Sequence, residues 1–171
     1  MHTLLLCWMA LSAPAEAHDP NIATFELTER GHVWWLEASF PQLTVDRALE
    51  AWLGEAAVAA MSETERKEAA VAYLKRTTRI EADGVAVPLG AGGIRLDGHQ
   101  TDLRLSLPSL PEDARALSVT LGCFTETGRQ YNVLRVSREG PEGPEILDRR
   151  VLGPDYGFTE HVTLEPASPS D

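Results

Sequence analysis

The sequence predicts a mainly β protein: an antiparallel, immunoglobulin-like β-sandwich with an inserted helical pair. Three observations predict this fold. Short runs alternate apolar and polar residues, turn residues separate the runs, and only residues 45–77 place apolar residues at helical spacing. Because strands do not alternate regularly with helices, a parallel α/β sheet is disfavoured.

The first two predicted strands, residues 22–29 and 32–40, are joined at Arg30-Gly31 and predict a tight hairpin. In the second strand Trp34 shares a face with apolar residues at alternate positions, so we expect it to face the core. Trp35 lies on the other face, where we expect a neighbouring element to cover it.

Two helices are expected within residues 45–77. Thr44 is placed to cap the first, and Ser62-Glu63-Thr64-Glu65 has the pattern of a capping box for the second. We expect Trp52 and Tyr73 to be packing anchors between the helices and the core.

Seven further strands are expected after the helices. Asp83-Gly84 and Asp97-Gly98 favour type I′ hairpin turns, because both central residues of that turn have positive φ. The strands cover residues 78–82, 85–89, 93–96, 101–107, 116–123, 130–137 and 145–152. Residues 165–171 are polar and rich in proline, so we expect a disordered tail after a single domain at residues 18–164.

Residues 1–17 have the pattern of a cleaved signal peptide. An apolar run of about ten residues is followed by Ala15-Glu16-Ala17, an A-x-A cleavage pattern, and this run is too short for a spanning helix. We therefore expect cleavage after Ala17, a periplasmic or secreted location, and a mature protein that does not span the membrane.

The charge balance narrows the classes of partner. The 171-residue chain has 15 Lys and Arg against 26 Asp and Glu, a net charge of −11. Because phosphate backbones and anionic membranes attract clustered cations, this balance disfavours nucleic acid as a partner. An exported or membrane protein remains a possible partner class.

Cleavage would leave Cys123 as the only cysteine, so an internal disulfide is excluded in the mature chain. We expect Cys123 to be a buried apolar residue. The common signatures of metalloproteases, α/β-hydrolases, phosphate-binding loops and dinucleotide-binding folds are missing from the sequence. This lowers the expectation of an enzyme, and no catalytic residue is nominated.

His18 is the candidate metal ligand, with Asp19 beside it. Cleavage before His18 would place an α-amine and an imidazole on one residue, a chelate suited to copper or nickel. The alternative is that His18 lies in a flexible lead. His32, His99 and His161 would complete such a site, or a hydrolase site, only if the fold brought them together.

Several short motifs resemble one family of small exported bacterial proteins, domain of unknown function 6702. The matching residues are Ala17-His18, Phe40 with Leu43, Tyr73-Leu74, Asp83-Gly84 and Gln130-Tyr131-Asn132-Val133. The resemblance implies an exported, β-rich domain and carries no established activity. A weaker resemblance is to the exported amino-terminal domains of some nickel or hydrogenase-accessory permeases.

The leading hypothesis from the sequence is therefore a periplasmic, non-catalytic binding or accessory module. A copper- or nickel-handling protein that uses His18 is the second hypothesis, and a hydrolase of an unfamiliar type is the third.

Overall fold

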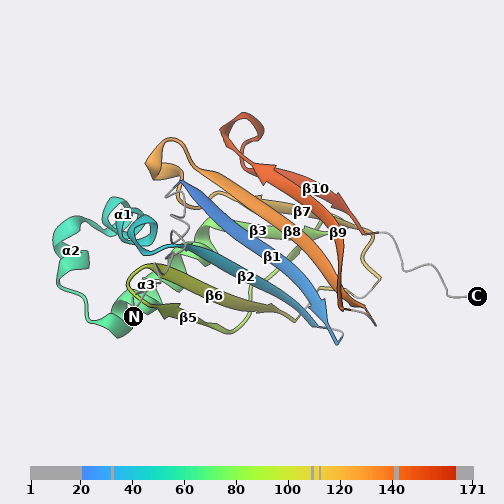
Figure 1. The fold of residues 1–171 in the computed structure, drawn as a ribbon, viewed down its shortest axis with the longest axis horizontal. Helices are drawn as coiled ribbons and strands as arrows, with labels where there is room; N and C mark the ends of the chain where they lie inside the picture. Colours follow the sequence, from blue (N-terminus) through green and yellow to red (C-terminus); the bar gives the residue numbers. More distant parts are fainter. Residues whose placement is uncertain (1–20, 32, 109, 112, 141–142, 165–171) are drawn as a thin grey trace, which may run out of the picture.

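Two β-sheets lie face to face, and three helices gather at one end of them (Figure 1). The computed structural model describes residues 21–31, 33–108, 110–111, 113–140 and 143–164. The predicted mainly β sandwich with a helical insertion is confirmed. The predicted signal peptide at residues 1–17, the candidate ligands His18 and Asp19, and the predicted tail at residues 165–171 lie outside the described residues.

The larger sheet has six strands and lies nearest the viewer in Figure 1. In spatial order they are β5 (Gly92–Leu96), β6 (Gln100–Leu107), β2 (Val33–Pro41), β1 (Ile22–Arg30), β8 (Tyr131–Gly140) and β9 (Gly143–Leu152). All neighbours are antiparallel except β1 and β8, which run parallel, with Ile22 opposite Tyr131. The strand patterns did not predict this parallel pair.

The smaller sheet lies behind and has four antiparallel strands. In spatial order they are β10 (Thr159–Thr163), β7 (Ala116–Leu121), β3 (Thr78–Ala82) and β4 (Val85–Val87). The prediction of nine strands was wrong here, because it omitted β10. Only Val162 of that short strand is buried, so its sequence lacks a clear alternation.

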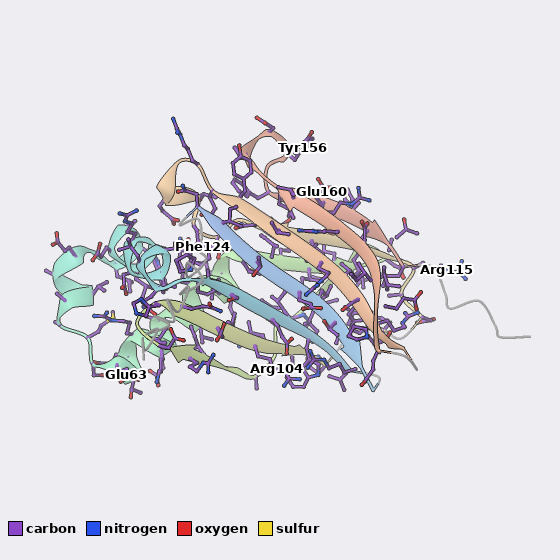
Figure 2. All side chains as sticks on the ribbon, viewed as in Figure 1. Glu63, Arg104, Arg115, Phe124, Tyr156 and Glu160 are labelled. Atoms are coloured by element: carbon purple, nitrogen blue, oxygen red, sulfur yellow. The ribbon has the colours of Figure 1, made fainter. Side chains whose placement is uncertain are left out.

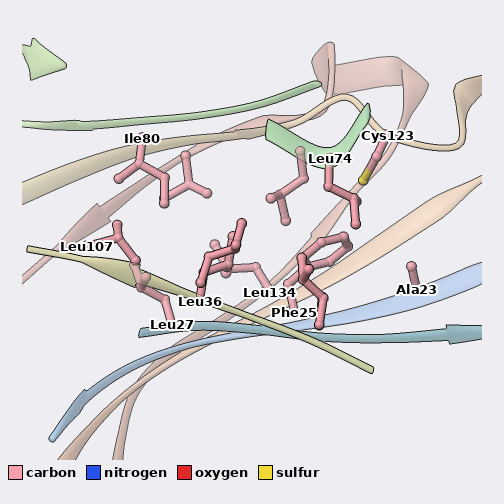
Figure 3. Packing of buried hydrophobic residues seen from close by; sticks show 14 of the residues in the cluster. Ala23, Phe25, Leu27, Leu36, Leu74, Ile80, Leu107, Cys123 and Leu134 are labelled. Carbon is pink, nitrogen blue, oxygen red and sulfur yellow. The ribbon is translucent and has the colours of Figure 1, made fainter. Parts of the chain in front are cut away.

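The core fills the space between the two sheets (Figure 3). Alternate residues of each central strand point into it. In β2 the buried residues are Trp34, Leu36, Ala38 and Phe40, as predicted, and Ile80 of β3 comes from the opposite sheet. Cys123 is also fully buried, which confirms its expected role.

One buried amide links the two sheets through hydrogen bonds. The Asn132 side chain, on β8, donates to the carbonyl of Leu121 at the end of β7 (2.6 Å) and to that of Cys123 (3.3 Å). Its own oxygen accepts from the side chain of Gln130 at 2.9 Å. Gln130 and Asn132 of that motif therefore have a structural role, since burial would otherwise leave the Asn132 amide unsatisfied.

The helical insertion is larger than the predicted pair. It comprises α1 (Gln42–Leu53), α2 (Glu55–Ala59) and α3 (Glu63–Thr77). Gly54, with φ of 92°, separates α1 from the short α2. The rings of Trp52 and Tyr73 lie 6.0 Å apart, and Tyr73 is fully buried, so the predicted packing role of this pair is confirmed.

The two predicted helix caps had opposite outcomes. The capping box at Ser62 is present, with Ser62 and Glu65 satisfying each other's backbone amides. The predicted cap at Thr44 is wrong, because β2 runs directly into α1 and Thr44 lies buried inside the helix. There the amide of Gln42 donates to the carbonyl of His99 at 3.0 Å, so a backbone group replaces the side-chain cap.

The two Asp-Gly turns also differ. Asp83 and Gly84 have φ of 49° and 79°, as the type I′ prediction requires. In the other turn only Gly98 has a positive φ, so the type I′ prediction is wrong. There the Asp97 carboxylate accepts hydrogen bonds from the amides of His99 and Gln100, which fixes a different loop.

Gly92 allows the edge strand β5 to lie close to β6. A Cβ added to Gly92 would meet the Arg104 carbonyl oxygen at 1.9 Å, whereas one added to Gly93 would meet nothing within 4 Å.

We expect Gly92→Ala to lower the free energy of unfolding by about 1–3 kcal/mol, because the backbone of β5 or β6 would have to shift. Gly93→Ala is the matched control, and equal loss in both variants by urea titration would contradict this packing argument.

Candidate functional site

A hollow of about 880 Å³ lies over the outer face of the six-stranded sheet. Every strand of that sheet contributes to its lining, and Figure 2 shows the side chains on this face, including Arg104 on β6. The lining includes four arginines and three carboxylates: Arg95, Arg104, Arg135, Arg149, Glu26, Glu37 and Asp102. The hollow is therefore an open, strongly charged surface.

One row of residues, charged from β6 to β9, crosses the sheet from edge to edge. Strand register places its members directly opposite one another in the order Gly93, Arg104, Glu37, Glu26, Arg135 and Arg149. Residues that face each other on adjacent strands have side chains on the same face. Along the row Arg104 is a cation, Glu37 and Glu26 are anions, and Arg135 and Arg149 are cations.

Ion pairs join the carboxylates of the row to neighbouring arginines. Glu26 pairs with Arg135 at 2.9 Å, and Glu37 pairs with Arg104 at 3.3 Å and with Arg30 at 2.9 Å. Among the described residues Arg149 has no ion-pair partner. The cation at the β9 end of the row is therefore the uncompensated one.

Asp102 is the centre of a second polar cluster in the hollow. It pairs with Arg95 and accepts hydrogen bonds from Gln100 (2.8 Å) and Ser39 (3.1 Å). Partial burial alone would raise the pKa of Asp102, but these hydrogen bonds and the Arg95 charge hold it below its usual value. The same contact raises the pKa of Arg95.

Trp35 forms part of the same outer face. It is half-buried, and the guanidinium of Arg104 lies 4.0 Å from its ring centroid. The expectation that Trp35 is covered is met by a charged side chain that stacks on it, a cation–π contact. This contact also fixes the position of Arg104 beside Glu37.

Apolar residues flank the charged row towards β9. Val133 of β8 lies opposite Val151 of β9, and Ile146 lies opposite Ser137, all on the outer face. Val151 and Ile146 are more than half exposed. A smaller hollow of about 240 Å³ adjoins the first, since Thr24 and Ser39 line both.

The histidines considered from the sequence do not gather in the described structure. His99 lies in the turn before β6 of the larger sheet and lines the smaller hollow, whereas His161 is an exposed residue of β10 in the other sheet. His32, like the candidate ligands His18 and Asp19, lies outside the described residues. Within the described ranges no three His, Cys, Asp or Glu residues form a group that could hold a metal.

Cys123 is inaccessible to solvent. Burial in the core raises the pKa of its thiol far above the ordinary value, and the side-chain amide of Asn132 donates to its sulfur at 3.7 Å. Because the thiolate is the reactive form, this environment makes the side chain inert at neutral pH.

Sequence reasoning missed the charged hollow. Its signal is present in the sequence, since Glu26, Glu37, Asp102, Arg104 and Arg135 each occupy a polar position in an alternating strand. Such positions are ordinarily solvated and scattered. Only the register of three strand pairs, β6 with β2, β2 with β1 and β1 with β8, brings these residues into one place.

The chain matches no known family model, and no curated protein is similar to it. The resemblance to domain of unknown function 6702 therefore stays a prediction.

Over the part of the chain that the structure describes, none of the helices has the length and apolar character that crossing a membrane requires.

Asp102→Asn tests the electrostatics of the hollow. A carboxyl whose pKa is lower in the folded protein contributes stability above its unfolded pKa of about 3.9 and loses it as pH falls through the folded pKa. We expect the variant to be less stable at pH 7 by less than about 1 kcal/mol, since the group is partly exposed. The difference should disappear in acid, as followed by urea unfolding from pH 7 to pH 2.5.

Asp155→Asn is the matched control for that pH series, because Asp155 is exposed and has no ion pair among the described residues. A stability difference for Asp102→Asn that stays constant down to pH 2.5 would contradict the role given to the Asp102 carboxylate.

Proposed function

We propose that the chain is an exported, non-catalytic binding module that holds a small ligand in the hollow on the outer face of its six-stranded sheet. The observation that carries the proposal is the hollow itself, about 880 Å³ with charges of both signs and an apolar flank. Ligand sites for small molecules commonly have volumes of about 300–1,000 Å³ and combine apolar surface with a few oriented polar groups.

The side chains that line the hollow are held in place, which favours recognition of a ligand. Most of its side chains stand on β1, β2, β6 and β8, whose opposite faces pack into the core, so the sheet fixes their positions. Ion pairs and the Arg104–Trp35 stack restrict them further. A site with side chains already held in place binds with a smaller entropic cost.

The charge states in the hollow favour binding over proton transfer. A general acid or base is most effective when its pKa lies near the working pH. Asp102 is displaced away from that range, because its pKa is lowered, and the pKa of its partner Arg95 is raised. These groups therefore keep fixed charges at neutral pH, which suits electrostatic recognition.

The location outside the cytoplasm rests on residues 1–17. The apolar run and Ala15-Glu16-Ala17 support a signal peptide cleaved after Ala17. The protein would then work in the periplasm or the medium, where an exported or membrane protein is the class of partner it could meet.

A ligand screen by NMR tests the binding proposal. Amide chemical shifts of the isotopically labelled protein, recorded against a library of small organic acids, amides and alcohols, should change around the hollow. Thr24→Trp should weaken the binding of any compound that is found, because Thr24 is exposed and lines the hollow.

Thr163→Trp is the control for that screen, since Thr163 is an exposed residue of β10 in the other sheet. Shift changes confined to the four-stranded sheet, equal weakening by both variants, or a library without a single compound that shifts the hollow would count against the binding site.

Export is tested by intact mass. The full chain is produced in a bacterium with an outer membrane. We expect to find it in the periplasm with the mass of a chain that begins at His18. Ala17→Lys should block processing, because signal peptidase needs a small residue there. A cytosolic protein that retains residues 1–17 would refute the export part of the proposal.

A further inference from the structure

We propose that the ligand of the hollow is a small organic acid with an apolar chain, and that its carboxylate binds at Arg149 and Arg135. This inference rests on the proposed function, because it names the class of ligand for the same hollow. Three observations carry it: a pair of opposed arginines, a β-bulge beside them, and the local charge balance.

The first observation is a juxtaposition of like charges. Arg135 of β8 and Arg149 of β9 lie directly opposite each other, and both line the hollow. Like charges in this arrangement repel and destabilise the strand pair. Glu26 compensates Arg135 at 2.9 Å, whereas Arg149 has no ion-pair partner within the described residues. A bound anion would remove the repulsion.

The second observation is the bulge in β9. Residues 146 and 149 would ordinarily point to opposite faces of a strand, because side chains alternate. The register shifts between Val136 and Ser137, so that Ile146 and Arg149 both line the hollow. Bulges of this kind re-aim side chains. This one places an exposed apolar residue next to the uncompensated guanidinium.

Val151 and Val133 extend the apolar surface on the other side of Arg149. Val151 shares the outer face of β9 with it, and Val133 lies opposite Val151 on β8. Ile146 and Val151 are 58% and 55% exposed. Exposed apolar residues on both sides of a cation fit a ligand that has an anionic group and a hydrocarbon part.

The third observation is the charge contrast between the hollow and the whole chain. The chain has a net charge of −11, yet four arginines and three carboxylates line the hollow, an excess of one positive charge. Because the protein as a whole repels anions, an anion that binds must be recognised locally. The planar guanidinium suits a carboxylate, since it can donate two parallel hydrogen bonds.

A comparison of octanoate with octanamide separates the contribution of the anionic group to binding from that of the apolar chain. They have the same hydrocarbon part and nearly the same size, but only octanoate is charged. We expect octanoate to bind the purified protein about tenfold more tightly at pH 7 by calorimetry and to shift the amides of β8 and β9. Arg149→Gln should bring the two affinities together, and Arg149→Lys should keep part of the preference.

Arg150→Gln is the matched control. Arg150 is an exposed neighbour on the same strand, but its register position opposite Leu134 places it on the other face of the sheet. Both variants remove one positive charge, so a long-range effect of charge would be equal. We expect Arg150→Gln to retain the preference for octanoate.

Equal binding of octanoate and octanamide in the hollow would overturn the inference and leave the binding module in place. The same holds if Arg150→Gln loses the preference as fully as Arg149→Gln does. Failure of the proposed function has a different signature, in which neither these probes nor the compound library shifts the hollow.

Discussion

Burial of one face of the six-stranded sheet is the constraint on which the remaining structure depends. The inward residues of its central strands pack against the smaller sheet and the helices. Because side chains alternate along a strand, burying one set fixes every other side chain on the outer face. A slip of one residue would bring Glu26 or Glu37 into the core. The strong requirement for an apolar interior thus also aligns the charges outside.

The sequence was sufficient for features that depend on neighbouring residues. The alternation around Trp34, the capping box at Ser62 and the Asp83-Gly84 turn all follow from local patterns. It was insufficient where a distant backbone decides the outcome. The amide of Gln42 is satisfied by the carbonyl of His99, which no local pattern at Thr44 could indicate. The charged hollow belongs to the same class, because it requires the pairing of β1 with β8.

Among the described residues of the outer face most charged groups have an ion-pair partner, and a smaller set has none. At β2 and β1 the adjacent Glu37 and Glu26 each have arginine partners, so their mutual repulsion is offset. At β8 and β9 only one of two opposed arginines is offset. Since surface ion pairs contribute little to stability, this pattern has only a small effect on folding. The inner polar groups differ, because the Asn132 amide is fully buried and is hydrogen-bonded to Gln130 and to the carbonyl of Leu121.

The parallel pairing of β1 with β8 sets an order of events during synthesis. Thr28 and Ser137, which share a buried hydrogen bond, are separated by 109 positions in the chain. The central strand therefore lacks one of its two neighbours until most of the polypeptide has left the ribosome. Contacts between distant segments also slow folding, since a long loop must close first. A nascent chain with this topology therefore completes its larger sheet only after β8 has emerged, late in synthesis.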